Sequence, residues 1–130
     1  MAEIRVFPDP PADWMGSLPE WAVYWALLQI GLIPNVDFFY QQPELGGRQQ
    51  LGGQVLDFYL PDYRLAISVQ STYWHYRSTP LRTQTEFARA VTEGRGITTI
   101  FIDEADALRN PIYYTREALN LRDHSKPGGF

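Results

Sequence analysis

Asp57 is the residue whose position most suggests chemistry. It stands inside Gln54–Leu60, a segment whose side chains alternate as they do in a half-buried strand. A carboxylate at such a position costs free energy unless it accepts hydrogen bonds, pairs with a cation or binds a metal ion. The chain has no cysteine, so oxygen, imidazole or water would have to hold any metal, which favours Mg²⁺ over structural zinc. The alternative is that Asp57 only accepts hydrogen bonds from backbone or arginine donors.

Three other polar residues could assist a carboxylate at position 57. Glu20 comes early in the first expected helix, and Gln70 ends the strand that follows Asp57. The Gln70 amide cannot act as a base, but it can hold water or a phosphate oxygen. His75, one of two histidines, follows Trp74 and could be a general base or a phosphate contact. The plainer alternatives are that Glu20 only completes a helix cap and that His75 is an ordinary core or surface histidine.

The helix that carries Glu20 has clear start and stop signals. The run from Ser17 to Glu20 is a capping box with proline in the first turn, and Gly31 ends a helix that reaches about Ile30. Four large side chains recur at helical spacing and predict a core-facing stripe rather than a binding surface: Trp21, Tyr24, Trp25 and Leu28.

The other elements follow from alternation, apolar runs and turn residues. Strands are expected over Val36–Gln42, Gln54–Leu60, Arg64–Gln70 and Ile97–Ile102, the last of them an interior strand running parallel to a neighbour. Helices are expected from about Ser78 to Glu93 and over Ile112–Leu121, with Asp103 capping a short turn between them. Residues 43–53 contain four glycines, which predict a hairpin loop. The loop is not a phosphate cradle, because no Gly-Lys-Ser/Thr follows it and no helix opens after it.

This order of elements is αβββαβα, within one domain over residues 17–121. A proline-rich extended arm is expected over residues 1–16 and a flexible tail over residues 122–130. The sequence has no apolar run of about 20 residues and no signal-peptide layout at its start. We therefore expect a protein that is not secreted through a signal peptide.

The charge distribution gives a mixed indication about nucleic acid. The net charge is −4, whereas phosphate contacts normally leave a basic footprint. Between Tyr76 and Gly96, however, four arginines face two acids. Arg77, Arg82 and Arg89 are therefore candidates for DNA contact. Arg82 and Arg89 are seven positions apart and share a helix face, which could bind backbone phosphates or could only be solvated.

Taken together, the helix acid, the strand aspartate and the Trp74-His75 pair after the third strand resemble the PD-(D/E)XK nuclease superfamily. The closest likeness is to its very-short-patch-repair endonuclease-like branch, over about Ser17 to Leu108. The resemblance implies a restriction-endonuclease-like α/β fold, with a central mixed four-stranded sheet flanked by helices. It also implies a site where Asp57 and the helix acid Glu20, acting through metal-bound water, converge on Mg²⁺ or Mn²⁺. The ion would activate water and stabilise charge on the scissile phosphate.

The third strand departs from the superfamily pattern. Its usual Glu-x-Lys signature is replaced by Ser68–Gln70, so the acid and the lysine are both missing. The repair-endonuclease branch also lacks this signature, and it uses a backbone carbonyl of the third strand as a metal ligand. That match assigns the carbonyl to Val69, puts Gln70 in place of one histidine and aligns His75 with the other. The zinc site of the branch needs cysteines, which this chain lacks.

Two functions are compatible with these residues. The first is a metal-dependent DNA endonuclease or nicking enzyme. The second is a catalytically silent nuclease fold that serves as a structural or DNA-contacting part of an assembly, such as a phage head or neck. The missing signature, the acidic balance and the many aromatic residues favour the second, with Trp21, Trp25 and Tyr113 as candidate protein contacts. The expected location is the cytoplasm or a phage particle.

Overall fold

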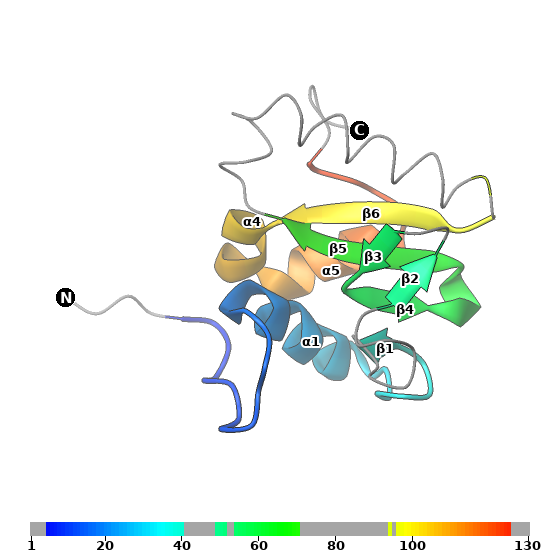
Figure 1. Cartoon of the computed structure of the whole chain (residues 1–130). Helices are drawn as coiled ribbons and strands as arrows, with labels where there is room; N and C mark the ends of the chain where they lie inside the picture. The colour runs from blue at the N-terminus through cyan, green and yellow to red at the C-terminus, as the bar shows by residue number, and fades with distance from the viewer. Residues whose placement is uncertain (1–4, 41–48, 52–53, 71–93, 95, 126–130) are drawn as a thin grey trace.

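The computed structural model describes residues 5–40, 49–51, 54–70, 94 and 96–125, and Figure 1 shows their arrangement. They form an α/β fold in which helices pack against a mixed four-stranded sheet of order β1-β4-β5-β6. The elements are α1 (Leu18–Ile30), β1 (Phe39–Tyr40), β2 (Gln49–Leu51), β3 (Gln54–Leu56), β4 (Phe58–Leu60), a 3₁₀ helix η2 (Pro61–Tyr63), β5 (Leu65–Gln70), β6 (Thr98–Asp103), α4 (Glu104–Arg109) and α5 (Pro111–Leu119).

The sheet is mixed because its two halves are connected differently. Strands β1, β4 and β5 are antiparallel neighbours, and β4 meets β5 in a register that pairs Phe58 with Ile67. Strand β6 lies parallel to β5, with Val69 opposite Ile102, as the apolar run in the sequence predicts. Parallel strands need a long connection, and residues 71–97 lie between β5 and β6 in the chain. The expected helix near residues 78–93 lies outside the described residues.

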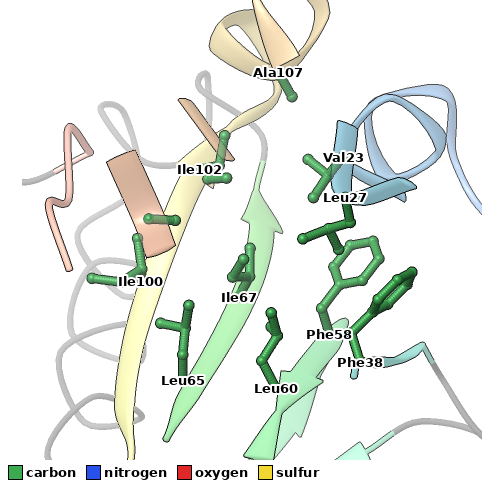
Figure 2. Close-up of a cluster of buried hydrophobic side chains, with 11 residues drawn as sticks. Val23, Leu27, Phe38, Phe58, Leu60, Leu65, Ile67, Ile100, Ile102 and Ala107 are labelled. Atoms are coloured by element: carbon green, nitrogen blue, oxygen red, sulfur yellow. The ribbon is translucent and has the colours of Figure 1, made fainter. Parts of the chain in front are cut away.

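The hydrophobic core fills the space between one face of the sheet and helices α1 and α5. Figure 2 shows Val23 and Leu27 of α1 directed toward Phe58 and Ile67. The core also takes Ala118 from α5, so both helices cover the same face of the sheet. Alternation along the strands, with Phe58 and Ile67 on the apolar side, is the reason that this face is buried.

The predicted strand Gln54–Leu60 is broken at Asp57. Strand β3 pairs with β2, which falls inside the expected loop of residues 43–53, whereas β4 joins the main sheet. Continuing the β4–β5 register would place Leu56 opposite Val69, yet the Val69 N–H donates to Asp57 Oδ2 at 2.8 Å. The side-chain carboxylate therefore takes the place of a backbone acceptor, and the main-chain ladder stops there.

The first predicted strand is also shorter than expected. Within the described part of Val36–Gln42, strand β1 contains only Phe39 and Tyr40, and Phe38 forms an isolated bridge with Pro34. The preceding residues form a turn, because the Asp37 carboxylate accepts the N–H of Ile33 at 2.8 Å and Asn35 adopts a left-handed φ of 64°.

Helix α1 begins and ends as its signals predict. The Ser17 hydroxyl accepts the Glu20 N–H at 3.2 Å, Glu20 Oε1 accepts the Ser17 N–H at 3.3 Å, and Gly31 has a φ of 107°. The predicted stripe, however, is only partly a core stripe. The centre of the core takes Val23 and Leu27, because α1 is buried on more than one side.

The aromatic side of α1 is covered by the N-terminal arm. Phe7 packs with Trp21 in a separate buried cluster, and the indole N–H of Trp21 donates to the carbonyl of Pro8 at 2.8 Å. Trp21 is therefore buried, and its proposed role as an exposed contact for a protein partner is wrong. Trp25 is half-buried, and Tyr113 keeps 46% of its surface exposed. Trp14 holds the end of the arm by packing against α1.

The sequence predicts a flexible tail over residues 122–130, and in the part of it that the structure describes, residues 122–125, Asp123 and Ser125 are buried. The buried carboxylate of Asp123 accepts the Phe101 N–H of β6 at 3.1 Å and the Ser125 N–H at 2.8 Å. In the part of the chain that the structure describes, no helix is long and apolar enough to cross a membrane.

Arg122 and His124 make the free energy of unfolding depend on pH, because both side chains contact the Glu117 carboxylate of α5. The hydrogen bond from His124 Nε2 to Glu117 Oε1, at 2.9 Å, holds the pKa of this carboxyl below its usual value; burial opposes the shift and Arg122 assists it. A carboxyl whose pKa is lowered in the folded state stabilises the fold above its unfolded pKa of about 4.3. This stabilisation is lost as the pH falls through the lower, folded-state pKa.

We therefore expect Glu117→Gln to lower the free energy of unfolding at pH 7, with the difference from wild type shrinking steadily below pH ~4. Urea unfolding between pH 3 and 7 measures it. His124→Gln removes the main partner of the carboxylate and should show the same pH trend. A difference of constant size across this range would contradict the assigned contact.

Candidate functional site

Asp57 sits at the junction of β3 and β4, next to the end of β5. Its side chain is only 4% exposed, and Oδ2 accepts the Val69 N–H at 2.8 Å and the Ser68 hydroxyl at 3.5 Å. In an extended strand the N–H and C=O of one residue point toward the same neighbour. The Val69 carbonyl therefore lies on the edge of β5 that faces Asp57. These are the two groups that the resemblance to the repair-endonuclease branch implies as metal ligands.

Gln70 lies beside an acid that sequence reasoning assigned to another role. Its Nε2 donates to Asp103 Oδ1 at 3.2 Å, and the parallel register pairs the two residues at the ends of β5 and β6. Asp103 occupies the N-cap position of α4, but its side chain makes no cap hydrogen bond. It is 4% exposed. The sequence carries one signal for this contact. Gln70 and Asp103 stand at the ends of two strands, and parallel neighbouring strands bring their carboxyl ends to the same edge of the sheet.

Glu20 is both a helix cap and part of a wider polar contact. Its carboxylate is buried, and Oε1 accepts the Tyr40 hydroxyl at 2.6 Å as well as the Ser17 N–H. Tyr40 pairs with Phe58, the residue after Asp57, so β1 links the start of α1 to the junction at Asp57. The Glu20 carboxylate therefore completes the helix cap, one of the two alternatives that the sequence offers, and also accepts a hydrogen bond from Tyr40. Its chemical role stays a prediction. Nothing in the sequence pattern singles out Tyr40.

Several predicted site residues lie outside the described residues, and their roles stay predictions. They are His75, with Trp74 before it, and the three arginines Arg77, Arg82 and Arg89.

The described residues suit a hard divalent ion that keeps several waters. Over the described ranges, no group of three or more acidic or histidine side chains gathers around one point. Mg²⁺ is commonly bound through one or two carboxylates and water, so a set made of Asp57 and the Val69 carbonyl fits its chemistry. Softer ions that need several imidazole or thiolate ligands do not fit this pair.

Comparison with known proteins agrees with the fold. The sequence matches no protein-family model and no curated protein. Among solved structures, the chain is similar to the catalytic domain of the homing endonuclease I-Bth0305I. The TM-score is 0.55 at 19% identity, and the match covers 78% of this chain and 90% of that domain. The chain therefore has a nuclease-like α/β fold, a mixed four-stranded sheet flanked by helices, as the sequence predicts.

Proposed function

We propose that this protein is a DNA endonuclease or nicking enzyme that uses Mg²⁺ or Mn²⁺. The observation that carries the proposal is the hydrogen bond from the Val69 N–H to Oδ2 of buried Asp57, at 2.8 Å. From strand geometry we infer that the Val69 carbonyl points to the same side of β5. A buried carboxylate and a main-chain oxygen that point to the same side of a strand end are suited to hold a hard cation. The fold likeness to an endonuclease catalytic domain supports the same conclusion.

In this proposal Asp57 and the Val69 carbonyl bind the ion, and Glu20 contacts it through a bound water. When bound, the metal activates water and stabilises charge on the phosphate. Asp103 orients the Gln70 amide, because only the NH₂ group of an amide can donate to a carboxylate. The second N–H of the Gln70 amide can then donate to a phosphate oxygen, and the amide oxygen can accept from water.

The remaining roles rest on the sequence. His75 assists proton transfer. Arg77, Arg82 and Arg89 contact the DNA backbone, which offsets the acidic balance of the chain.

Nicking of supercoiled plasmid tests the proposal directly. The purified chain is incubated with plasmid in Mg²⁺, in Mn²⁺ and in EDTA, and open-circular and linear products are separated on a gel. We expect nicked product with either metal and none with EDTA. Absence of cleavage with both metals would remove the enzymatic function.

A second candidate, a silent structural component, is favoured by a groove between the arm, α1 and α4. The groove has a volume of about 760 Å³. Its apolar lining includes Val6, Leu18 and Leu108, which are exposed, and it also contains Arg5 and Arg109. An exposed apolar patch bordered by charge is typical of a protein contact. Arg5 pairs with Asp9 and Arg109 with Asp106, so the apolar lining is bordered by ion pairs. The occupant that we propose for this groove is a second copy of this chain.

Sedimentation velocity over a range of concentrations tests this second candidate. Self-association through the groove should disappear in Leu108→Glu, because a carboxylate in the apolar contact would be desolvated. Ile33→Glu changes an equally large exposed apolar residue that does not line the groove, and it should associate as wild type does. A chain that stays monomeric at every concentration would rule out this assembly.

A further inference from the structure

We propose that Tyr40 is a positioning residue that holds the Glu20 carboxylate in place for metal binding. The inference deepens the proposed nuclease function and rests on it. Tyr40 touches neither Asp57 nor Val69 among the contacts described above, so it would act through Glu20.

The hydrogen bond between the two side chains has the length of a strong one. The Tyr40 hydroxyl donates to Glu20 Oε1 at 2.6 Å, within the range of bonds from a neutral hydroxyl to an ionised oxygen. The Ser17 N–H donates to the same oxygen at 3.3 Å. Two donors from different elements, β1 and the start of α1, therefore fix where Oε1 lies and how the carboxylate is turned.

The Tyr40 ring is itself held on two sides. Trp14 stacks on it, with ring centroids 4.8 Å apart and planes 18° from parallel, and Phe58 packs at 4.9 Å. The backbone of Tyr40 pairs with Phe58 in the sheet. A ring fixed in this way gives its hydroxyl little freedom, so the position of the hydroxyl is set before any ligand arrives.

Gly16 shows that the chain makes room for this bond. A Cβ at position 16 would lie 1.9 Å from the Tyr40 hydroxyl oxygen and 2.7 Å from Glu20 Oε1. The hydroxyl cannot move away easily, because its ring is packed against Trp14 and Phe58. A capping box needs only Ser17 and Glu20. The hydrogen bond from Tyr40 to Glu20, and the space that Gly16 leaves for it, are therefore not needed to cap the helix.

In the proposed site Glu20 reaches the ion through a bound water, so Tyr40 would orient a carboxylate that holds a metal-bound water in place. Loss of such a partner typically costs 10- to 100-fold in affinity or activity. We expect Tyr40→Phe to weaken Mn²⁺ binding by about 10-fold, because the ring remains but the donor to Glu20 is lost.

The test compares Tyr40→Phe with Tyr24→Phe. Tyr24 belongs to the same aromatic cluster, with its ring 6.0 Å from that of Tyr40, and it makes no hydrogen bond to Glu20. Binding of Mn²⁺ to each protein without DNA is measured from the loss of the free-ion signal in electron paramagnetic resonance. Nicking is then followed as a function of Mn²⁺ concentration.

We expect Tyr40→Phe to raise the Mn²⁺ dissociation constant and the half-saturating Mn²⁺ concentration together. Its nicking rate at saturating Mn²⁺ should return to within about 3-fold of wild type, since the loss lies in metal affinity. Gly16→Ala should act in the same direction, and Tyr24→Phe should match wild type. A general loss of folding would instead lower the rate at every metal concentration.

Two outcomes overturn the inference, and they differ in what else they remove. If wild type binds Mn²⁺ and Tyr40→Phe binds it equally well, Tyr40 does not position Glu20, while the proposed nuclease function stands. If wild type binds no Mn²⁺, the metal site and the role of Tyr40 fall together.

Discussion

Replacing Asp57 with asparagine is expected to lower metal-dependent nicking at least about 100-fold, because a direct ligand should matter more than a residue behind it. Asparagine keeps an oxygen that can accept the Val69 N–H, but it removes the negative charge that a divalent cation needs. The substitution therefore separates the chemical role of Asp57 from its structural one. Initial rates of plasmid nicking measure the first, and urea unfolding measures the second.

Two variants control this experiment. Asp57→Ala also removes the acceptor for the Val69 N–H, and leaving that group unsatisfied should cost about 1–3 kcal/mol of stability. Asp62→Asn changes an exposed acid in the 3₁₀ helix that follows β4 and should leave the nicking rate unchanged. If Asp57→Asn kept a rate within a few-fold of wild type, Asp57 would not be a metal ligand and the cleavage would have another source.

The largest expected loss of stability comes from Phe58→Ala, at about 3–5 kcal/mol. Phe58 is 0% exposed and packs against Tyr40 and Phe38, with ring centroids at 4.9 and 6.4 Å. Removing the ring costs its transfer free energy and leaves a cavity, because the surrounding side chains relax only in part. Domains of this size are stable by about 5–15 kcal/mol, so the variant should unfold at much lower urea concentration. Tryptophan fluorescence follows the transition.

Tyr63→Ala is the matched control for Phe58→Ala. Tyr63 is also aromatic and only five positions away, but it is 41% exposed, and its loss should change stability by no more than about 0.5 kcal/mol. Equal losses in the two variants would contradict the placement of Phe58 in the core. Because Phe58 follows Asp57 and pairs with Tyr40, we also expect Phe58→Ala to weaken Mn²⁺ binding.

Features encoded over a few neighbouring residues were predictable from the sequence. The capping box at Ser17 and Glu20 and the end of α1 at Gly31 depend only on backbone geometry within one or two turns. The alternation that buries Leu65 and Ile67 follows from the two-residue period of a strand. The short apolar run before Asp103 likewise predicted the parallel strand β6, since a strand covered on both faces has no polar side.

The contacts of the candidate site were not predictable in this way, because each joins residues that are distant in the chain. Tyr40 and Glu20 are 20 positions apart, and Gln70 and Asp103 are 33 apart. Local periodicity carries no information about which of many polar residues meet at such separations. That depends on strand register and on how α1 packs against the sheet. The break at Asp57 also depends on a contact between distant residues. The alternating pattern continues through position 57, but the Asp57 carboxylate accepts the Val69 N–H of β5, and the main-chain ladder stops there.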